Sequence, residues 1–155
     1  LPHDTAAGVV KALLDQNIIF DFVTDFTLKN AKIDSVETFE FTDFDGFAKY
    51  VQSKNFDYQT ATEKKINELR DVAARESLPL NNEIAGLENK IKTEKKGELS
   101  KNRDRILHEI EQDIVGRYYF QRGKVRKNLV NDPEVKEAIK LLNDSERYNG
   151  ILSGK

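Results

Sequence analysis

The chain has no cysteine, no methionine and no tryptophan, and only three prolines. Without cysteine it can form neither a disulfide framework nor a thiolate zinc site, so two common ways of stabilising a small domain are excluded. No apolar run approaches the roughly 18 residues that a membrane span needs, and the richest stretch, residues 17–26, is interrupted by Asp21 and Asp25. The chain opens on Leu1 without a basic and then apolar signal region, so we expect a fragment or a processed product.

The residues that are present are typical of a soluble helical protein. Charged residues make up 34% of the chain and hydrophobic residues 38%, a balance that disordered chains do not have. A chain of this length buries roughly two-thirds of the surface that it exposes when unfolded, which is enough for one core. We therefore predict a single domain over residues 1–155. Residues 1–60 hold ten acidic residues and five lysines, whereas the remainder holds seventeen acidic and twenty basic residues.

Hydrophobic spacing predicts a first helix and a connector. Apolar side chains recur every three or four positions between residues 9 and 26, which predicts an amphipathic helix from Thr5 to about Lys29. Residues 31–41 have no helical period, so we expect an extended connector, with at most a short strand, whose apolar side chains pack on the core. These side chains are Val36, Phe39 and Phe41.

Capping signals mark the next helices. Thr42 followed by Asp45 predicts one helix start, and Thr60 followed by Glu63 is a capping box, in which each side chain accepts a hydrogen bond from the other residue's backbone amide. A later helical stretch runs through a very polar region, residues 92–105, where Gly97 can either divide two helices or soften one long helix. The polar face of this stretch predicts a solvent-exposed helical hairpin or arm.

Residues 113–152 read DIVGRYYFQRGKVRKNLVNDPEVKEAIKLLNDSERYNGIL and predict a long C-terminal helical arm. We expect one long amphipathic helix, then a break with Asp132 as N-cap and Pro133 at the first position of a second helix, and a short closing helix around Tyr148. Four apolar side chains of the second helix are expected to face inward: Val135, Ala138, Ile139 and Leu142. The predicted fold class is all-α: a multi-helix domain with a long C-terminal helical arm and an extended aromatic connector.

No set of residues in the chain assembles a catalytic centre. A serine peptidase needs a hydroxyl nucleophile beside a base, with donors placed to stabilise the oxyanion. None of the six serines lies in a glycine-flanked turn, and we expect them in helix caps, connectors and polar helix surfaces. They are Ser35, Ser53, Ser77, Ser100, Ser145 and Ser153, of which Ser77 and Ser145 are the expected caps.

His108 shares a predicted helix face with Asp104 and Glu111, and such a set could hold a divalent metal ion. Combinations of this kind are common on charged helices, and three exposed ligands bind weakly without supporting groups around them. The pair His108–Glu109 is not followed by a second histidine, so the zinc-peptidase motif is absent. We therefore predict no catalytic residue, no metal site and no cofactor.

The segment RYYFQRGKVRK, residues 117–127, combines aromatic rings with Arg122, Lys124, Arg126 and Lys127 and could bind single-stranded nucleic acid. On a helix the three rings point in different directions, so they cannot form one stacking platform. The net charge of −2 also differs from the high pI of nucleic-acid-binding domains. Nucleic-acid binding is disfavoured, and the basic side chains are equally suited to an acidic protein face or to anionic lipid.

Together with NIIFDFVTDF, FAKYVQSKNFDYQT and NDPEVKEAIKLLND, residues 113–152 resemble the C-terminal region of carboxyl-terminal processing (tail-specific) serine peptidases, particularly the envelope enzymes of Bacteroidetes-type bacteria. The resemblance covers most of the chain. It implies an upstream PDZ module and an upstream peptidase domain with a Ser and Lys dyad, and neither has matching positions here. It also implies a periplasmic or cell-envelope endopeptidase that recognises the C-terminal tails of its substrates.

On this resemblance, the chain is a noncatalytic C-terminal domain that supports assembly, substrate access or regulation of proteolysis. Its expected partners are the upstream peptidase domain, a second subunit in a homo-oligomer, and the protein or peptide substrates of the parent enzyme. The predicted contact is the apolar face of the first helix, formed by Leu13, Ile19, Phe22 and Phe26. The alternative is a stand-alone helical adaptor that binds a protein or nucleic acid through Arg122, Lys124, Arg126 and Lys127. Salt-sensitive binding of oligonucleotides would favour the adaptor.

Overall fold

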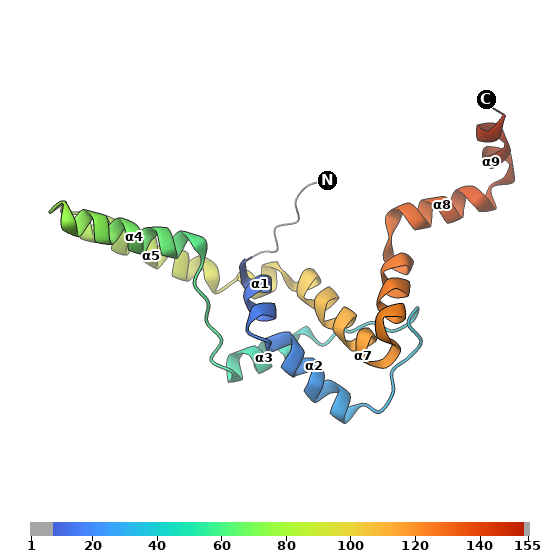
Figure 1. Ribbon diagram of the computed structural model, residues 1–155, viewed down its shortest axis with the longest axis horizontal. Helices are drawn as coiled ribbons and strands as arrows, with labels where there is room; N and C mark the ends of the chain where they lie inside the picture. Colours follow the sequence, from blue (N-terminus) through green and yellow to red (C-terminus); the bar gives the residue numbers. More distant parts are fainter. Residues whose placement is uncertain (1–7, 154–155) are drawn as a thin grey trace. The chain divides into compact units, whose positions relative to one another are not determined.

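The computed structural model describes residues 8–153, except for the side chain of Asn131, and within this range the chain forms helices and no strand (Figure 1). The helices are α1 (Gly8–Asp15), α2 (Ile18–Lys29), α3 (Phe44–Ser53), α4 (Ala61–Arg75), α5 (Asn81–Lys95), α6 (Glu98–Lys101), α7 (Arg103–Asn131), α8 (Pro133–Asn143) and α9 (Ser145–Leu152). The predicted all-α class is confirmed. No described helix combines the length and the apolar character that crossing a membrane requires.

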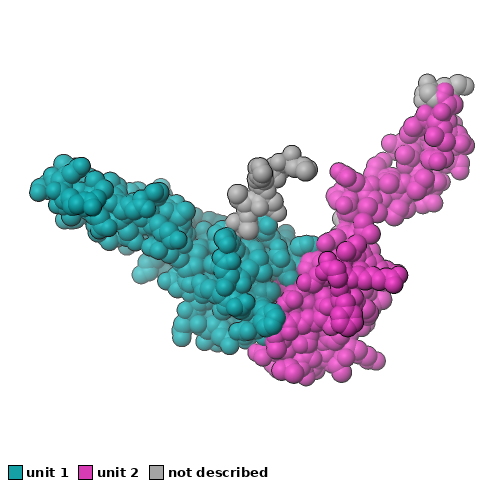
Figure 2. All heavy atoms as spheres, viewed as in Figure 1, with its two compact units in different colours: residues 1–22, 42–109 teal, residues 23–41, 110–155 magenta. Residues whose placement is uncertain are grey.

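The chain divides into two compact units (Figure 2). In the described range, unit 1 consists of residues 8–22 and 42–109, and unit 2 consists of residues 23–41 and 110–153. Each unit is therefore built from two separate stretches of sequence. The prediction of a single domain over the whole chain stays a prediction, and the units are described separately below.

The core of unit 1 is apolar and rich in phenylalanine. Phe47 of α3 is fully buried, and the ring of Phe22 meets it edge-on, with ring centroids 5.1 Å apart. Phe22 also contacts the Tyr50 ring at 5.2 Å. Edge-to-face ring pairs stabilise a core beyond the burial of their area. The other side chains that are almost fully buried in this unit are Val9, Val10, Leu13, Ile19, Ile84 and Ile106.

The first predicted helix is two helices in the structure. Asn17 lies between α1 and α2 with a φ of 58°, a left-handed conformation that asparagine tolerates better than most residues. This residue interrupts the helix, so the prediction of a continuous helix was wrong, although its predicted end at Lys29 is confirmed. The predicted start at Thr5 lies outside the described residues.

Helix starts follow the capping signals with two corrections. The side chain of Asp43, rather than Thr42, caps α3 by accepting a hydrogen bond from the Gly46 amide at 2.9 Å. The capping box of Thr60 and Glu63 at the start of α4 is confirmed, because both reciprocal hydrogen bonds are present. Asp144, rather than Ser145, caps α9. The division of the polar stretch at Gly97 is confirmed, since this residue lies between α5 and α6.

Unit 2 contains the extended connector and α7 from Ile110 onwards. As predicted, the described residues 31–41 form no helix, and Val36, Phe39 and Phe41 are buried. The Tyr118 hydroxyl donates a hydrogen bond to the carbonyl oxygen of Asn30, and the Tyr119 hydroxyl donates one to that of Asp34 at 2.9 Å. These two bonds hold the connector against α7.

α7 reverses direction at Phe120, where the sequence predicted one uninterrupted helix. Phe120 has a φ of 57° and a ψ of −164°, so α7 consists of two helical segments on either side of it. A side chain on Gly123 would collide with Tyr119 Cβ, 2.4 Å from the added atom, which shows how closely the segments approach. A hydrogen bond of 2.7 Å from Gln112 to Asn128 joins them. The turn and the missing side chain of Gly123 together make a tight helical hairpin.

The C-terminal helices α8 and α9 have an exposed apolar face. Asp132 caps α8 and Pro133 is its first residue, as predicted. The expectation that Val135, Ala138, Ile139 and Leu142 face inward was wrong, because no residue of α8 or α9 is buried. α8 packs mainly on α9, and an amphipathic pattern alone does not provide a core for it to pack against.

Candidate functional site

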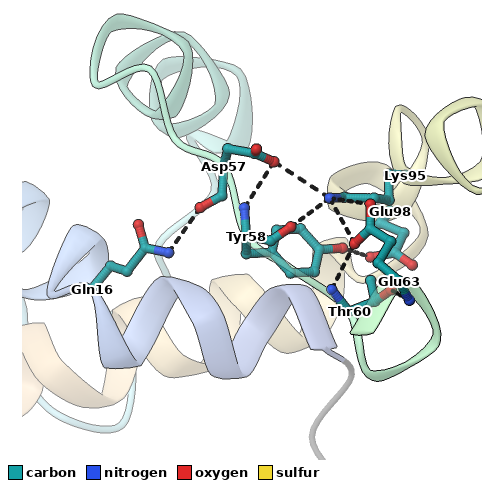
Figure 3. Close-up of polar contacts among 7 residues, drawn as sticks. All are labelled: Gln16, Asp57, Tyr58, Thr60, Glu63, Lys95 and Glu98. Carbon is teal, nitrogen blue, oxygen red and sulfur yellow. Dashed lines mark hydrogen bonds and ion pairs between the residues drawn. The ribbon is translucent and has the colours of Figure 1, made fainter. Parts of the chain in front are cut away.

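The ammonium of Lys95, at the end of α5, contacts several polar groups of unit 1 (Figure 3). Lys95 Nζ donates to the Tyr58 carbonyl oxygen at 2.5 Å, to Glu63 Oε1 at 3.1 Å and to Asp57 Oδ1 at 3.3 Å. Its side chain is only 16% exposed. An ammonium has three N–H donors, so these three partners satisfy it.

Tyr58 connects this group to the neighbouring segments. Its ring lies 4.5 Å from Lys95 Nζ, within range of a cation–π contact, and stacks on Phe56 with centroids 5.6 Å apart. The Tyr58 hydroxyl donates a hydrogen bond to Glu98 of α6. Gln16, which follows α1, donates from Nε2 to the carbonyl oxygen of Asp57 at 2.9 Å, as Figure 3 shows. Residues 57–58 are thus tied to α1, α5 and α6.

Glu63 has two functions, as a helix cap and as a partner of Lys95. Its Oε2 accepts from the Thr60 amide at 2.7 Å, and its own amide donates to Thr60 Oγ1 at 3.1 Å. Burial alone would raise the pKa of the Glu63 carboxyl, but the hydrogen bond from the Thr60 amide and the contact with Lys95 hold this pKa below its ordinary value. Glu63 is therefore a fixed anion at neutral pH.

A cleft of about 870 Å³ lies beside these residues in unit 1, a volume within the range of small-molecule sites. Its acidic groups are already paired, since Asp57 and Glu63 contact Lys95, and Glu88 pairs with Arg70 at 2.5 Å. The cleft thus presents a satisfied ion-pair network instead of reactive groups. The remaining lining side chains are amides, apolar groups and further lysines, including Gln52, Asn55, Asn67, Val51, Leu99, Lys92 and Lys96.

Three of the described serines make local contacts through their hydroxyl groups. Ser53 donates to the Tyr50 carbonyl oxygen at 2.7 Å, and Ser153 donates to the Gly150 carbonyl oxygen at 3.0 Å. The hydroxyl groups of Ser35 and Thr38 are 3.0 Å apart. Contacts of this kind close turns and helix ends.

The candidate metal set around His108 is separated by other contacts. His108 is exposed, whereas Glu111 accepts a hydrogen bond from the Phe41 amide at 3.1 Å and lies 3.4 Å from Lys127 Nζ. In the part of the chain that the structure describes, no three His, Asp or Glu side chains are grouped as metal ligands. Glu111 is an ion-pair partner in the α7 hairpin.

Two of the four residues predicted on the first apolar face occupy the interior. Leu13 is fully buried and Ile19 is 2% exposed, so a partner could reach them only by displacing core side chains. Phe22 and Phe26 are half-buried, and Phe26 packs edge-on against Phe41 at 5.8 Å. That this face contacts a partner stays a prediction. The sequence period identified an apolar face, but it did not distinguish the chain's own core from an interface.

The four predicted basic contacts have different environments. Lys127 is 2% exposed and donates a hydrogen bond to the Phe39 carbonyl oxygen, in addition to its ion pair with Glu111. Arg126 pairs with Glu37. Arg122 is exposed and Lys124 is half-buried. The burial of Lys127 could not be predicted from the residues around it, because its partners, Phe39 and Glu111, come from other parts of the chain.

α8 and α9 of unit 2 carry several exposed apolar side chains. Ile139 is 53% exposed and Leu142 63%, and on α9 Ile151 is 56% and Leu152 69% exposed. Ile139 and Leu142 are three positions apart and share one face of α8. Grouped apolar side chains at a surface mark interaction sites, whereas isolated ones are normal. We name these four residues the C-terminal apolar face.

Comparison with known proteins agrees with the helical architecture and with the resemblance noted in the sequence. The sequence model of one protein family, described as "Probable PDZ-protease, C-terminal helical domain", matches residues 9–142. The match includes residues of both units. It ends one residue before the end of α8, so α9 lies outside it. No curated protein and no solved structure matches the chain significantly. The chain belongs to the family of C-terminal helical domains of probable PDZ-proteases.

Proposed function

We propose that this chain is a noncatalytic domain that docks on the peptidase domain of its own parent protein and supports the assembly of that enzyme. The C-terminal apolar face is the observation that carries this proposal. Its four side chains are each more than half exposed, and no residue of α8 or α9 is buried. Leaving such a face in water has a free-energy cost that a protein surface would remove.

Family membership supports the parent's peptidase domain as the surface on which the C-terminal apolar face docks. A C-terminal helical domain of a PDZ-protease is covalently joined to its peptidase, so the peptidase domain is present at a high effective concentration. Under that condition even a small apolar contact gives a stable association. Docking through α8–α9 would fix the C-terminal end of the domain and leave unit 1 to carry other contacts.

Three further properties of the parent enzyme are part of the proposal and rest on the resemblance alone. The parent is a serine endopeptidase with a Ser and Lys dyad in an upstream domain. It acts in the periplasm or cell envelope. Its substrates are proteins or peptides that are recognised by their C-terminal tails, and this domain controls their access or the regulation of proteolysis through its docked position.

Polar substitution on the C-terminal apolar face tests the docking. In the full-length parent enzyme, the double substitution Ile139→Glu and Leu142→Glu should lower the melting temperature of the peptidase domain by several degrees, because it removes about 2 kcal/mol of apolar burial and places charge in the contact. Differential scanning calorimetry and peptide hydrolysis report stability and activity. The 155-residue chain alone should keep its melting temperature, since neither residue is buried in it.

Lys140→Glu is a matched control, because it changes the charge of an exposed residue on α8 that is neither three nor four positions from Ile139 or Leu142. It should leave the full-length enzyme unchanged. Full stability and full activity of the Ile139→Glu and Leu142→Glu enzyme would overturn the docking proposal.

A further inference from the structure

The α4–α5 hairpin of unit 1 has two sides that differ in chemistry. The helices lie side by side (Figure 1), with Ile66, Ala73 and Ile84 buried. Two ion pairs join the helices, Glu63–Lys95 at 3.1 Å and Arg70–Glu88 at 2.5 Å. From the first pair to the second the chain advances seven residues along α4 and goes back seven residues along α5. Both pairs therefore define one register for these antiparallel helices.

The ion pairs also identify which residues lie on the opposite side. Leu69 and Leu87 each precede a member of the Arg70–Glu88 pair by one residue, which is 100° around an α-helix. Antiparallel helices turn in opposite senses when viewed from one end. Both leucines therefore lie on one side of the hairpin, opposite the side that carries the ion pairs. Val72 follows Leu69 by three positions and shares its face. Leu69, Val72 and Leu87 are 43%, 37% and 47% exposed. We name these three residues the hairpin apolar face.

Charged residues flank this face in a symmetrical order. Along α4 the same ridge reads Lys65, Leu69, Val72, Glu76, so its basic and acidic ends are equally far from its centre. Along α5 Glu83 and Lys90 lie on the two sides of Leu87. In the register set by the ion pairs, the midpoint between Lys65 and Glu76 on α4 lies beside the midpoint between Glu83 and Lys90 on α5, to within about one residue. All four charged side chains are on exposed residues.

We propose that the hairpin apolar face binds the same face of a second copy of this chain, about a two-fold axis perpendicular to the helices. In this pairing Lys65 lies opposite the partner subunit's Glu76, and Lys90 lies opposite the partner subunit's Glu83. Leu87 meets the partner subunit's Leu87 near the axis. The product is an antiparallel four-helix bundle, in which each hairpin covers the apolar residues that the other leaves in water.

The charges favour this pairing over the alternative face-to-face dimer. A two-fold axis parallel to the helices would bring Glu76 close to the partner subunit's Glu83, and Lys65 close to the partner subunit's Lys90. Those contacts are between like charges and would oppose association. The existing pair of Lys65 with Glu68 on the same helix, 2.7 Å apart, is well exposed, with side chains 77% and 62% accessible. Such a pair is weak and easily exchanged.

The interface is small, so a concentration-dependent monomer–dimer equilibrium is expected. Sedimentation equilibrium of the 155-residue chain between about 1 and 500 µM should show dimer formation. Leu69→Glu combined with Leu87→Glu should weaken the dimer by at least about 100-fold, because four charges replace apolar contacts at the symmetric interface. Circular dichroism reports whether each variant remains helical.

Charge exchange distinguishes the proposed pairing from nonspecific association. Lys65→Glu alone should weaken the dimer about tenfold, and adding Glu76→Lys to the same chain should restore it, since opposite charges face each other again. Leu28→Glu is the matched control, because Leu28 is 82% exposed and lies on α2, outside the hairpin. It should leave the equilibrium unchanged.

A chain that stays monomeric at the highest concentration would overturn the proposal. A dimer that survives the double substitution Leu69→Glu and Leu87→Glu would also overturn it. So would a failure of Glu76→Lys to restore the dimer that Lys65→Glu had weakened. The result is independent of docking on the parent peptidase, because that proposal concerns α8 and α9. Variants of one surface leave the other intact.

Discussion

Single polar residues hold segments together that are far apart in the sequence. Lys95 bonds to Asp57, Tyr58 and Glu63, which precede it by 38, 37 and 32 positions. Lys127 in unit 2 has a similar role, since it contacts Phe39 and Glu111 from a buried position. A charge that is withdrawn from water requires such partners, because an unpaired buried charge is strongly destabilising. These two lysines are therefore structural groups in their units.

The contribution of the Glu63–Lys95 pair can be measured by removing one charge. Glu63→Gln keeps an oxygen that accepts the Thr60 amide hydrogen bond, but it removes the anion that faces Lys95. We expect the free energy of unfolding at pH 7 to fall by about 1 kcal/mol. Urea unfolding measures the difference. Glu68→Gln is the matched control, since it removes an exposed partner of Lys65 on the same helix and should have little effect.

The same substitution has an expected pH dependence. The pKa of Glu63 in the folded chain is lower than its ordinary value of 4.5, so its anion stabilises the fold fully above that value. This stabilisation is lost as the pH falls through the lowered folded pKa. The difference in the free energy of unfolding between the wild type and Glu63→Gln should therefore shrink as the pH falls below the ordinary value of 4.5. A constant difference over this range would show that the charge is not its source.

At the scale of elements, most local signals were read correctly, although Asp43 and Asp144 cap α3 and α9 in place of Thr42 and Ser145. The single-residue breaks were not predicted. The capping box of Thr60 and Glu63 and the start at Pro133 depend on neighbouring residues, so the sequence contains them. The breaks at Asn17 and Phe120 each depend on one residue in a left-handed conformation that tertiary packing imposes. Neither residue interrupts the apolar period, so the sequence predicted continuous helices.

Phe120 offers a direct test of the break in α7. Its φ of 57° and ψ of −164° lie in a region that glycine adopts easily and other residues do not, and its ring is 76% exposed. Phe120→Gly should therefore raise the free energy of unfolding by about 1 kcal/mol, because strain is relieved and little packing is lost. Thermal unfolding followed by circular dichroism measures the change.

Phe120→Ala separates the two effects in that experiment. Alanine removes the ring but keeps the side-chain carbon that makes this backbone conformation costly, so it should not stabilise the chain. A destabilised Phe120→Gly variant would mean that α7 does not turn at this residue in solution.

At the scale of the whole molecule, the sequence predicted the fold class and the family but not the surfaces. Helical period marks an apolar face without showing what covers it. Leu13 and Ile19 were predicted at an interface and lie in the core, whereas Ile139 and Leu142 were predicted inside and lie at the surface. Burial depends on which elements meet, and those contacts join residues that are distant in the sequence. The candidate site around Lys95 was missed for the same reason.

Removal of the C-terminal arm tests this division between core and surface. A chain ending at Asp132 lacks the 11 residues of α8 and the 8 residues of α9, and none of these is buried. We expect its melting temperature to stay within about 2 °C of that of the whole chain, because the loss amounts to less than 1 kcal/mol of core packing. Its helical circular dichroism signal should fall only by the share of the deleted helices. A drop of about 5 °C or more would show that α8 and α9 help to hold the rest of the chain together, and the C-terminal apolar face would then belong to the domain's own core instead of to an interface with the peptidase.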